Sequence, residues 1–494
     1  MGKKIPMWQC LVTMLFTLIA LAYSLGMLGK VFGPAFACDY GYVHIPLICS
    51  AIFAAIIAII NGYKWSFLEA GILASINRSM QAMLILLTVG LLIGSWIAAG
   101  VVPAMIFYGL KILSPGIFLI ASCILCCIVS LATGSSWTTA GTIGIALIGI
   151  GQGLGMDPAM IAGAIVSGAY FGDKMSPLSD TTNLAPAMAG ATLFDHIRHM
   201  IWTVTPSLVI SLVIFGILGM GKAGQTVDMS VVNALQEGLK DNFNINLALL
   251  IPPIVVIAIV ALRLPALPGL MGGIVLGCIF GSIFQGVSIA DWPGILHNGF
   301  KFANPDVVMP DLVALLEKGG MASMLGTINL IICAMCFGGI MDASGMLATM
   351  AEALLKVAKN TGSLVTVTIF SCIFMNVIAG DQYLAIVLPG RMYKEAFEDR
   401  KLAPKNLSRA LEDSGTITSC LVPWNTCGAT MSTFLGVPTG SYARYAFLNI
   451  INPLVSIFYG FTGISMEKMT DEQYERVMEE RKAEKEAALR ALEA

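Results

Sequence analysis

Long apolar runs follow one another along almost the whole chain, and they constrain its fold more than any other feature. Runs such as residues 8–30, 81–99 and 266–285 are long enough to cross the hydrocarbon core of a bilayer as helices. Inside that core every backbone amide must be hydrogen-bonded within the protein, and a helix meets this requirement by itself. The sequence therefore predicts an all-α, polytopic membrane protein.

Charged residues are scarce and unevenly distributed. Lys and Arg number 28 and Asp and Glu number 30 in 494 residues, and fifteen of these lie in the last 29 positions. Hydrophobic residues make up 57% of the chain, so a soluble globule of this composition would precipitate. The net charge of −2 offers no concentrated basic face for nucleic acid, and only four histidines are available for catalytic or metal centres. We therefore expect neither a soluble enzyme nor a protein that binds nucleic acid.

Fourteen apolar segments are separated by charges, turns and prolines. They lie near residues 8–30, 44–61, 81–99, 101–113, 116–151, 158–195 and 199–220, and near residues 244–262, 266–285, 321–343, 345–358, 362–390, 409–440 and 444–462. Seven segments in each half place the halves in opposite orientations across a bilayer, because an odd number of crossings ends on the far side. The sequence predicts a transporter with two inverted-topology repeats and broken or re-entrant helices.

Short motifs recur between the two halves in the same order. Gly134 and Pro177 are 43 residues apart, and Gly380 and Pro423 repeat that spacing 246 residues later. The predicted domains follow from this repeat. They are a first membrane repeat at 1–220, an extracytoplasmic linker at 221–243, a second inverted membrane repeat at 244–462 and a charged cytoplasmic C-terminal helix at 463–494.

Basic residues indicate which side of the membrane the termini occupy. With the N-terminus in the cytoplasm, 19 of the 28 Lys and Arg residues, Lys111 among them, fall on the cytoplasmic side, where such residues accumulate. The C-terminal residues alternate acidic and basic side chains at helical spacing, which is typical of a solvated helix. We expect a multi-pass membrane protein with both termini in the cytoplasm.

Two apolar segments, 116–151 and 158–195, are about twice as long as a straight membrane helix needs to be, so they must be broken or re-entrant. The first is interrupted by a run rich in glycine and hydroxyl groups, in which Ser135 and Thr138 are candidate ligands. In the second, Pro177 blocks a continuous helix. The candidate ion or substrate ligands there are Asp173, Ser176, Asp180, Thr181, Thr182 and Asn183. Polar groups are costly in hydrocarbon unless they are paired, which favours a functional role.

The second half repeats this pattern with different residues. At the offset of 246 residues Asp381 corresponds to Ser135, and Asn425 and Thr426 lie in the second break of that half. Related by a pseudo-two-fold axis, the four breaks converge near the midplane, where unwound backbone beside carboxylates holds dehydrated cations in secondary transporters. The predicted Na⁺ ligands are Asp173, Asp180 and Asp381.

Other interpretations of the ionisable residues stay open. Lys174 either neutralises Asp173 when no cation is bound or serves as the counter-ion of an organic anion. The aspartates of the first half also fit ordinary Asx turns in a loop. Glu412 and Asp413 fit the start of a helix, and Asp342 fits either a cavity wall or a helix cap.

Two further motifs indicate structure rather than chemistry. His196 and His199 are three residues apart without acidic partners, which favours an interfacial anchor over a zinc site. Gly273, Gly277 and Gly281 have the spacing for close helix contact, either within the scaffold or between the subunits of a homodimer. The chain contains no Walker motif, and we expect no cofactor.

The residues from Thr133 to Thr142 and from Ser167 to Ala185 resemble the NhaC family of sodium/proton antiporters. The resemblance implies sodium/proton exchange in the cytoplasmic (inner) membrane of a prokaryote, by a transporter of inverted-repeat design. The family also includes a malate/lactate antiporter and sodium-coupled amino-acid carriers, and residues 101–180 are similar to the malate/lactate branch as well. The ion-site residues that the resemblance implies are Asp173, Ser176, Asp180, Thr181, Thr182 and Asn183, whereas Asp381 and Asn425 rest on the repeat.

The sequence therefore supports two alternative functions. The first is an antiporter that exchanges cytoplasmic Na⁺ for external H⁺ by alternating access, with buried carboxylates that bind the two ions competitively. The alternative is a sodium-coupled carrier of a small organic solute, in which a helix N-terminus faces the carboxylate of a malate, lactate or amino-acid substrate. The expected partners are Na⁺, H⁺, membrane lipid and, for the alternative, a small carboxylate or amino acid.

Overall fold

A computed structural model describes residues 2–33, 38, 43–112, 114–223, 229–262, 266–479 and 481. Within these residues the chain is helical, and an isolated bridge between Leu402 and Lys468 is the only β-pairing. The predicted charged tail helix is described over residues 471–479, whereas residues 482–494 lie outside the described residues.

Most of the helices lie within the predicted apolar segments, but the segment predicted at 81–99 belongs to a helix that begins already at Trp65. The first half contains α1 (Met7–Ser24), α2 (Met27–Phe32), α3 (His44–Ile60), α4 (Trp65–Ala98), α5 (Val101–Ile112), α6 (Pro115–Thr133), α7 (Ser136–Thr139), α8 (Ile145–Gly153), α9 (Pro158–Met175), α10 (Asp180–Ala189) and α11 (Leu193–Ala223). Then come α12 (Met229–Asn242), α13 (Ile251–Ala261), α14 (Ala266–Phe284), α15 (Trp292–Asn298), α16 (Pro310–Leu316), α17 (Leu325–Ala343), α18 (Met346–Leu355), α19 (Thr361–Ile378), α20 (Gln382–Glu398), α21 (Pro404–Leu411), α22 (Ile417–Ser419), α23 (Thr426–Leu435), α24 (Thr439–Tyr442) and α25 (Phe447–Thr462). Two π-helical turns, Ala140–Gly144 and Glu412–Thr416, join α7 to α8 and α21 to α22.

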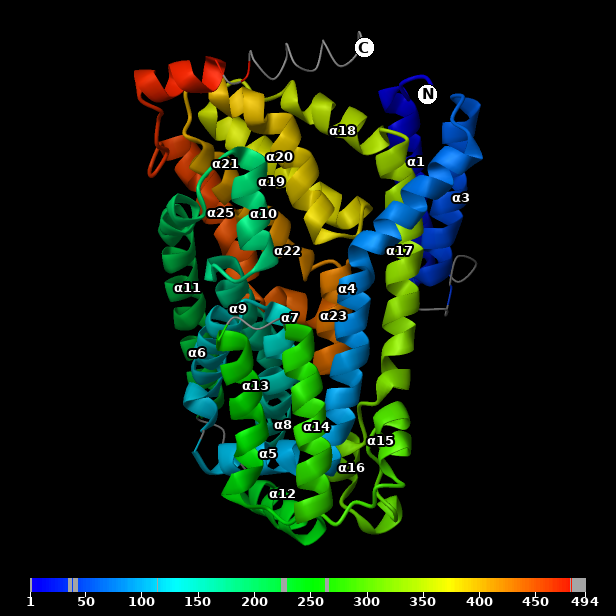
Figure 1. The fold of residues 1–494 in the computed structure, drawn as a ribbon, viewed down its shortest axis with the longest axis vertical. Helices are drawn as coiled ribbons and strands as arrows, with labels where there is room; N and C mark the ends of the chain where they lie inside the picture. The colour runs from blue at the N-terminus through cyan, green and yellow to red at the C-terminus, as the bar shows by residue number, and fades with distance from the viewer. Residues whose placement is uncertain are drawn as a thin grey trace.

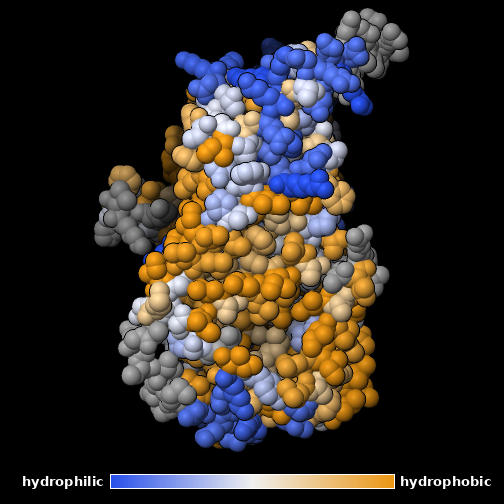
Figure 2. Space-filling model, turned by 90° about the vertical axis from the view of Figure 1, so that its left-hand side faces the viewer, coloured by the Kyte–Doolittle hydropathy of each residue, from blue (hydrophilic) through white to orange (hydrophobic). Residues whose placement is uncertain are grey.

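The surface of the molecule is that of a membrane protein. In the described part of the chain seven helices are long and apolar enough to cross a membrane, or up to nine spans if two bent helix pairs each count as one. On the face that Figure 2 shows, a broad apolar band crosses the middle of the molecule, and hydrophilic residues gather at its two ends. Apolar surface of this extent belongs in hydrocarbon rather than in water. The prediction of an all-α, polytopic membrane protein is confirmed.

The start of α1 and the helix of residues 471–479 lie at the same end of the long axis (Figure 1). At the opposite end lies α5, whose last turn contains Lys111. The structure thus separates Lys111 from the termini, contrary to the sequence prediction. The segment predicted as a linker, 221–243, contains α12, and the chain bends by 99° between α12 and the next span.

Both overlong segments are broken where the sequence predicts. The first break follows α6 at Gly134, which adopts a left-handed φ of 69°, and Ser135 then caps α7. The second follows Met175, and the chain stays unwound through Pro177 until α10 begins at Asp180. Glycine adopts a positive φ without strain and proline lacks an amide hydrogen, so both breaks follow from local sequence.

The second half is interrupted at matching positions 246 residues later. Gly380 has a φ of 66° and precedes Asp381, which caps α20. The bounds of α23 are those of α10 shifted by the same offset, and each helix ends at a left-handed glycine, Gly190 or Gly436. These matched boundaries support the prediction of two repeats, while the opposite orientation of the halves stays a prediction.

Close contact between α6 and α9 brings the two breaks of the first half together. A Cβ atom on Gly168 would lie 2.2 Å from the carbonyl oxygen of Cys123, and one on Gly172 would lie 2.2 Å from the amide nitrogen of Leu131. Only glycine at these places lets the helix backbones approach so closely. Asp173 follows Gly172 directly, so this packing places its carboxylate beside the start of α7.

The glycines of α14 pack within the chain. A Cβ atom on Gly277 would lie 3.0 Å from Trp96 of α4, and Trp96 Nε1 donates a hydrogen bond of 3.0 Å to the carbonyl oxygen of Gly273. Gly281 faces Trp292 and Ala99. Of the two predicted roles for these glycines, the structure shows the scaffold contact.

Candidate functional site

A cavity of about 320 Å³ lies where the broken helices meet. The first residues of α7, α10, α20 and α23 line it, together with the middle of α4. The predicted ligands that line the cavity are Ser135, Asp173, Asp180, Thr181, Asp381 and Thr426. Residues from both halves of the sequence therefore meet at one cavity.

Asp173 is a buried carboxylate at this cavity, in the last turn of α9. Ser136 Oγ donates a hydrogen bond of 2.6 Å to its Oδ2, and Ser179 Oγ donates one of 2.7 Å to its Oδ1. Ser136 opens α7 and Ser179 precedes α10, so the carboxylate joins the two breaks. A hydroxyl that donates its hydrogen keeps its lone pairs, and these three groups supply the oxygen atoms that hard cations prefer.

The unwound stretch before α10 is held in place by its own side chains. Thr182 Oγ1 donates hydrogen bonds of 2.9 Å to the carbonyl oxygens of both Asp173 and Lys174. The side chains of Asn183 and Ser176 bond to backbone groups of the same stretch. These three predicted ligands therefore fix the backbone around Asp173 in this conformation.

Ser135 and Asp381 have the same geometry at the starts of α7 and α20. Ser135 Oγ accepts a hydrogen bond of 3.1 Å from the amide of Thr138, and Asp381 Oδ1 accepts one of 2.9 Å from the amide of Leu384. The Thr138 hydroxyl is buried and has no hydrogen-bond partner among the residues described. Each cap satisfies a helix amide that would otherwise be orphaned next to the cavity.

Asn425 and Thr426 begin α23. Asn425 Oδ1 accepts a hydrogen bond of 3.0 Å from the amide of Cys427, and its Nδ2 lies 3.1 Å from both oxygens of Asn376. The amide of Thr426 donates a hydrogen bond of 2.9 Å to the carbonyl oxygen of Gly380. Asn425 thus acts as a cap, and Thr426 ties this break to the start of α20.

The three aspartates of the cavity differ in exposure. Asp180 is exposed, whereas Asp173 and Asp381 are 7% and 2% exposed. Tyr383, also at the cavity, points its hydroxyl at Asp180 Oδ2 from 3.5 Å. Across the described ranges no three Asp, Glu, His or Cys side chains lie close enough to hold a metal ion together, so the aspartates do not form one compact cluster. The cavity instead leads from an exposed carboxylate to two buried ones.

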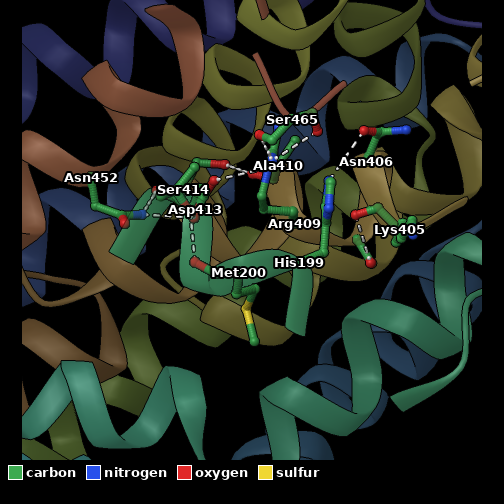
Figure 3. Close-up of polar contacts among 12 residues, drawn as sticks. His199, Met200, Lys405, Asn406, Arg409, Ala410, Asp413, Ser414, Asn452 and Ser465 are labelled. Atoms are coloured by element: carbon green, nitrogen blue, oxygen red, sulfur yellow. Dashed lines mark hydrogen bonds and ion pairs between the residues drawn. The ribbon is translucent and has the colours of Figure 1, made fainter. Parts of the chain in front are cut away.

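Lys174 pairs with Asp413 rather than with its neighbour Asp173. Its ammonium group bonds to Asp413 Oδ1, and Asn452 Oδ1 lies 3.2 Å away. Arg409 Nε lies 3.8 Å from the other oxygen of Asp413, and all these side chains are buried. Figure 3 shows Arg409 and Asn452 converging on Asp413. The interpretation that Lys174 neutralises Asp173 is therefore wrong, and its ammonium group already has a partner within the protein.

Several other residues differ from the sequence interpretation. Asp342 forms an ion pair of 3.2 Å with Arg78 instead of capping a helix. His196 and His199 are buried and hydrogen-bond to α21, so the prediction of an interfacial anchor is wrong. Glu412 lies in a π-helical turn inside a continuous helix, not at a helix start.

Several polar residues of the cavity region are not among the predicted ligands. Ser136 and Ser179 donate to the buried carboxylate, and both belong to the predicted breaks. Ser79 and Gln81 line the cavity from α4. The sequence signal for Ser79 and Gln81 was their closeness to each other in an apolar helix, since polar residues of membrane helices face the protein interior.

The family profile and the relatives that this chain matches are all antiporters. The profile of the Na⁺/H⁺ antiporter family matches residues 168–464. A Na⁺/H⁺ antiporter NhaC from Alkalihalophilus pseudofirmus is 39% identical, over 86% of this chain and 91% of that protein. A malate-2H⁺/Na⁺-lactate antiporter from Bacillus subtilis is 38% identical, over 85% and 89%. The arginine/ornithine antiporter ArcD from Halobacterium salinarum is 36% identical, over 86% and 87%.

Proposed function

The chain belongs to the Na⁺/H⁺ antiporter family, and we propose on this premise that it exchanges Na⁺ for H⁺ across the inner membrane of a prokaryote. Its relatives are transporters and not enzymes. The observation that carries the proposal is the buried carboxylate of Asp173, which two hydroxyl groups hold at a cavity that the exposed Asp180 also lines.

Na⁺ binds at Asp173 in this mechanism. The carboxylate and the oxygens of Ser136 and Ser179 replace part of the water shell of the ion, and Asp180 and Asp381 add negative charge along the cavity. Protonation of a buried carboxyl group here removes charge that attracts Na⁺, and bound Na⁺ in turn disfavours the proton. This competition couples the two ions and requires no cofactor.

Alternating access follows from the two halves in this proposal. The helix pairs α6–α7 and α19–α20 are each broken at a left-handed glycine next to the cavity, and their matched boundaries favour repeats at 1–220 and 244–462. With the repeats inverted and both termini in the cytoplasm, movement of one half against the other opens the cavity to each side in turn. The segment 221–243 then connects the repeats outside the cytoplasm.

Proteoliposomes test this function directly. The purified chain is reconstituted, a Na⁺ gradient is imposed, and a pH-sensitive dye inside the vesicles reports proton movement. We expect proton flux with Na⁺ alone, and loss of that flux in Asp173→Asn. Asp306→Asn, which neutralises an exposed aspartate far from the cavity in sequence, serves as the matched control and should keep full flux. Full flux in Asp173→Asn would remove this residue from the mechanism.

A sodium-coupled organic solute is the second candidate, because the cavity is larger than a bare cation needs. Its volume of about 320 Å³ equals about ten water molecules at roughly 30 Å³ each. The helix starts of α7 and α23 also line it and favour a carboxylate group. The same vesicles, supplied with malate, lactate or arginine, separate the two candidates. Proton or Na⁺ flux that appears only with one of these solutes would identify an organic substrate.

A further inference from the structure

Glu412 is a buried acidic residue that the mechanism above does not use. It opens the π-helical turn between α21 and α22 and is 0% exposed. Neither of its carboxyl oxygens makes a hydrogen bond of ordinary geometry with any residue that the structure describes, although the hydroxyls of Thr181 and Thr416 lie beside it. An ionised carboxylate without a partner is costly in such surroundings, whereas the neutral acid is tolerated. π-Helical turns inside α-helices also occur frequently at functional sites.

Asp413, the next residue, has the opposite environment. Its Oδ1 accepts hydrogen bonds from Lys174, from Thr203 Oγ1 at 2.9 Å and from Asn452 Nδ2 at 2.8 Å. Arg409 approaches its Oδ2, as Figure 3 shows. Two cations and two neutral donors hold this carboxylate in its ionised form. Asp413 is therefore the fixed counter-ion of Lys174, and Glu412 is the carboxyl group of the pair that can take up a proton.

The charges around Glu412 link it to the cavity. Asp173, Lys174 and Cys372 interact with the charge of Glu412, and Lys174 in turn interacts with His196, Arg409 and Asp413. Asp180 interacts with Asp173, and Asp381 lines the same cavity. With Glu412 ionised, Asp173, Glu412 and Asp413 balance Lys174 and Arg409 to one net negative charge, to which Asp180 and Asp381 add at the cavity. A proton on Glu412 or Na⁺ at Asp173 each reduces this negative charge by one. Because both sites lie in a medium of low dielectric constant, a positive charge gained at one of them weakens the binding of a cation at the other.

The hydroxyl groups of Ser179 and Thr181 lie between the two carboxyl groups. Ser179 Oγ donates its hydrogen to Asp173, so it accepts at its contact of 3.1 Å with Thr181 Oγ1. Thr181 lies beside Glu412 and lines the cavity. A protonated Glu412 that turned toward Thr181 would donate to its hydroxyl, and the three hydroxyl hydrogens would then all point toward Asp173. When Glu412 is ionised, Thr181 can donate to it instead and leave Ser179 without a donor.

We propose that Glu412 binds the proton that is exchanged, at a site separate from the Na⁺ site at Asp173. Na⁺ and H⁺ then compete through the charge of one buried cluster and through the hydroxyls of Ser179 and Thr181, rather than for the same oxygen atoms. The proton adds to the Glu412 carboxylate as Na⁺ leaves and returns to water as Na⁺ binds. This inference rests on the proposed Na⁺/H⁺ exchange.

Equilibrium binding of radioactive Na⁺ to the purified full chain across a range of pH tests the proposal. We expect the Na⁺ affinity of the unchanged protein to fall by up to about tenfold for each pH unit of acidification, because one proton is exchanged for one ion. Glu412→Gln mimics the protonated acid, so it should bind Na⁺ more weakly at alkaline pH and show little change with pH. Glu69→Gln, on an exposed residue of α4, is the matched control and should behave like the unchanged protein.

The outcomes separate the two proposals. If Glu412→Gln keeps the full pH dependence of Na⁺ binding, the separate proton site is refuted while Na⁺/H⁺ exchange stands. If the unchanged protein binds no Na⁺ at any pH, the proposed function itself fails.

A spectroscopic signal tests the same group when the glutamine variant does not fold. Na⁺-induced infrared difference spectra should show the loss of a protonated carboxyl band, and this band should shift in Glu412→Asp, which keeps an acid at a shorter reach. An unshifted band in Glu412→Asp would assign the proton to another carboxyl group and overturn the proposal.

Discussion

Replacing Lys174 by methionine should destabilise the protein strongly, although the two side chains have similar volumes. Lys174 and Asp413 are both completely buried, so the change leaves an ionised Asp413 inside the protein with fewer partners. Breaking a buried ion pair by removing one partner costs about 3–5 kcal/mol. Asp413 keeps hydrogen bonds from Thr203 and Asn452 and a distant contact with Arg409, so we expect a loss near the lower end, about 3 kcal/mol.

Equilibrium unfolding in mixed micelles, followed by tryptophan fluorescence, measures this loss. A loss of about 3 kcal/mol raises the unfolding equilibrium constant by about two orders of magnitude. The double variant Lys174→Met with Asp413→Asn removes both charges, so it should be more stable than the sum of the two single changes predicts. Lys4→Met removes one partner of an exposed pair with Glu352 and should cost no more than about 1 kcal/mol. A cost for Lys174→Met as small as that of Lys4→Met would refute the reasoning.

Three further predictions follow from particular contacts. Ser179→Ala removes one of the two hydroxyl groups that donate to the buried carboxylate of Asp173. It should weaken Na⁺ binding about tenfold or more, since a hydrogen bond to a charged group contributes about 1.5–3 kcal/mol. An unchanged Na⁺ affinity in a binding assay would contradict this prediction. Gly172→Ala should lower the thermal stability because its Cβ atom would lie 2.2 Å from backbone of α6, whereas Gly221→Ala, with no described atom within 4 Å, should not. Lys401 donates a hydrogen bond to Asp471 and holds the pKa of that carboxyl group below its usual value. At pH values above the ordinary carboxyl pKa this contact should therefore keep the tail docked. As the pH falls through the lowered pKa, Asp471 takes up a proton and the tail should be released. Limited proteolysis of the tail, faster in acid and in high salt, reports that release.

The breaks and the cavity carboxylates could be predicted from sequence because local rules govern them. Gly134 and Pro177 interrupt helices through their own backbone properties, and Asp173 is conspicuous between apolar flanks. The partner of Lys174 could not be predicted in this way. Adjacent residues of a helix point about 100° apart, so Lys174 faces away from Asp173, and its actual partner Asp413 lies 239 residues later. Contacts between helices far apart in sequence depend on packing that no local pattern contains.

Four helix starts meet at the cavity, and the residues at these starts bear on the order in which solutes bind. A helix N-terminus carries roughly half a positive charge, which attracts anions. Asp381 at the start of α20 and Asp180 in the first turn of α10 offset that charge, whereas the uncharged Ser135 and Asn425 cap α7 and α23. A carboxylate solute therefore meets two helix starts that attract it and three aspartates that repel it, so it should bind only after Na⁺ or H⁺ has neutralised part of this charge. Calorimetry with malate or lactate should show binding with Na⁺ present or in acid, and binding to the Na⁺-free protein at alkaline pH would refute this order.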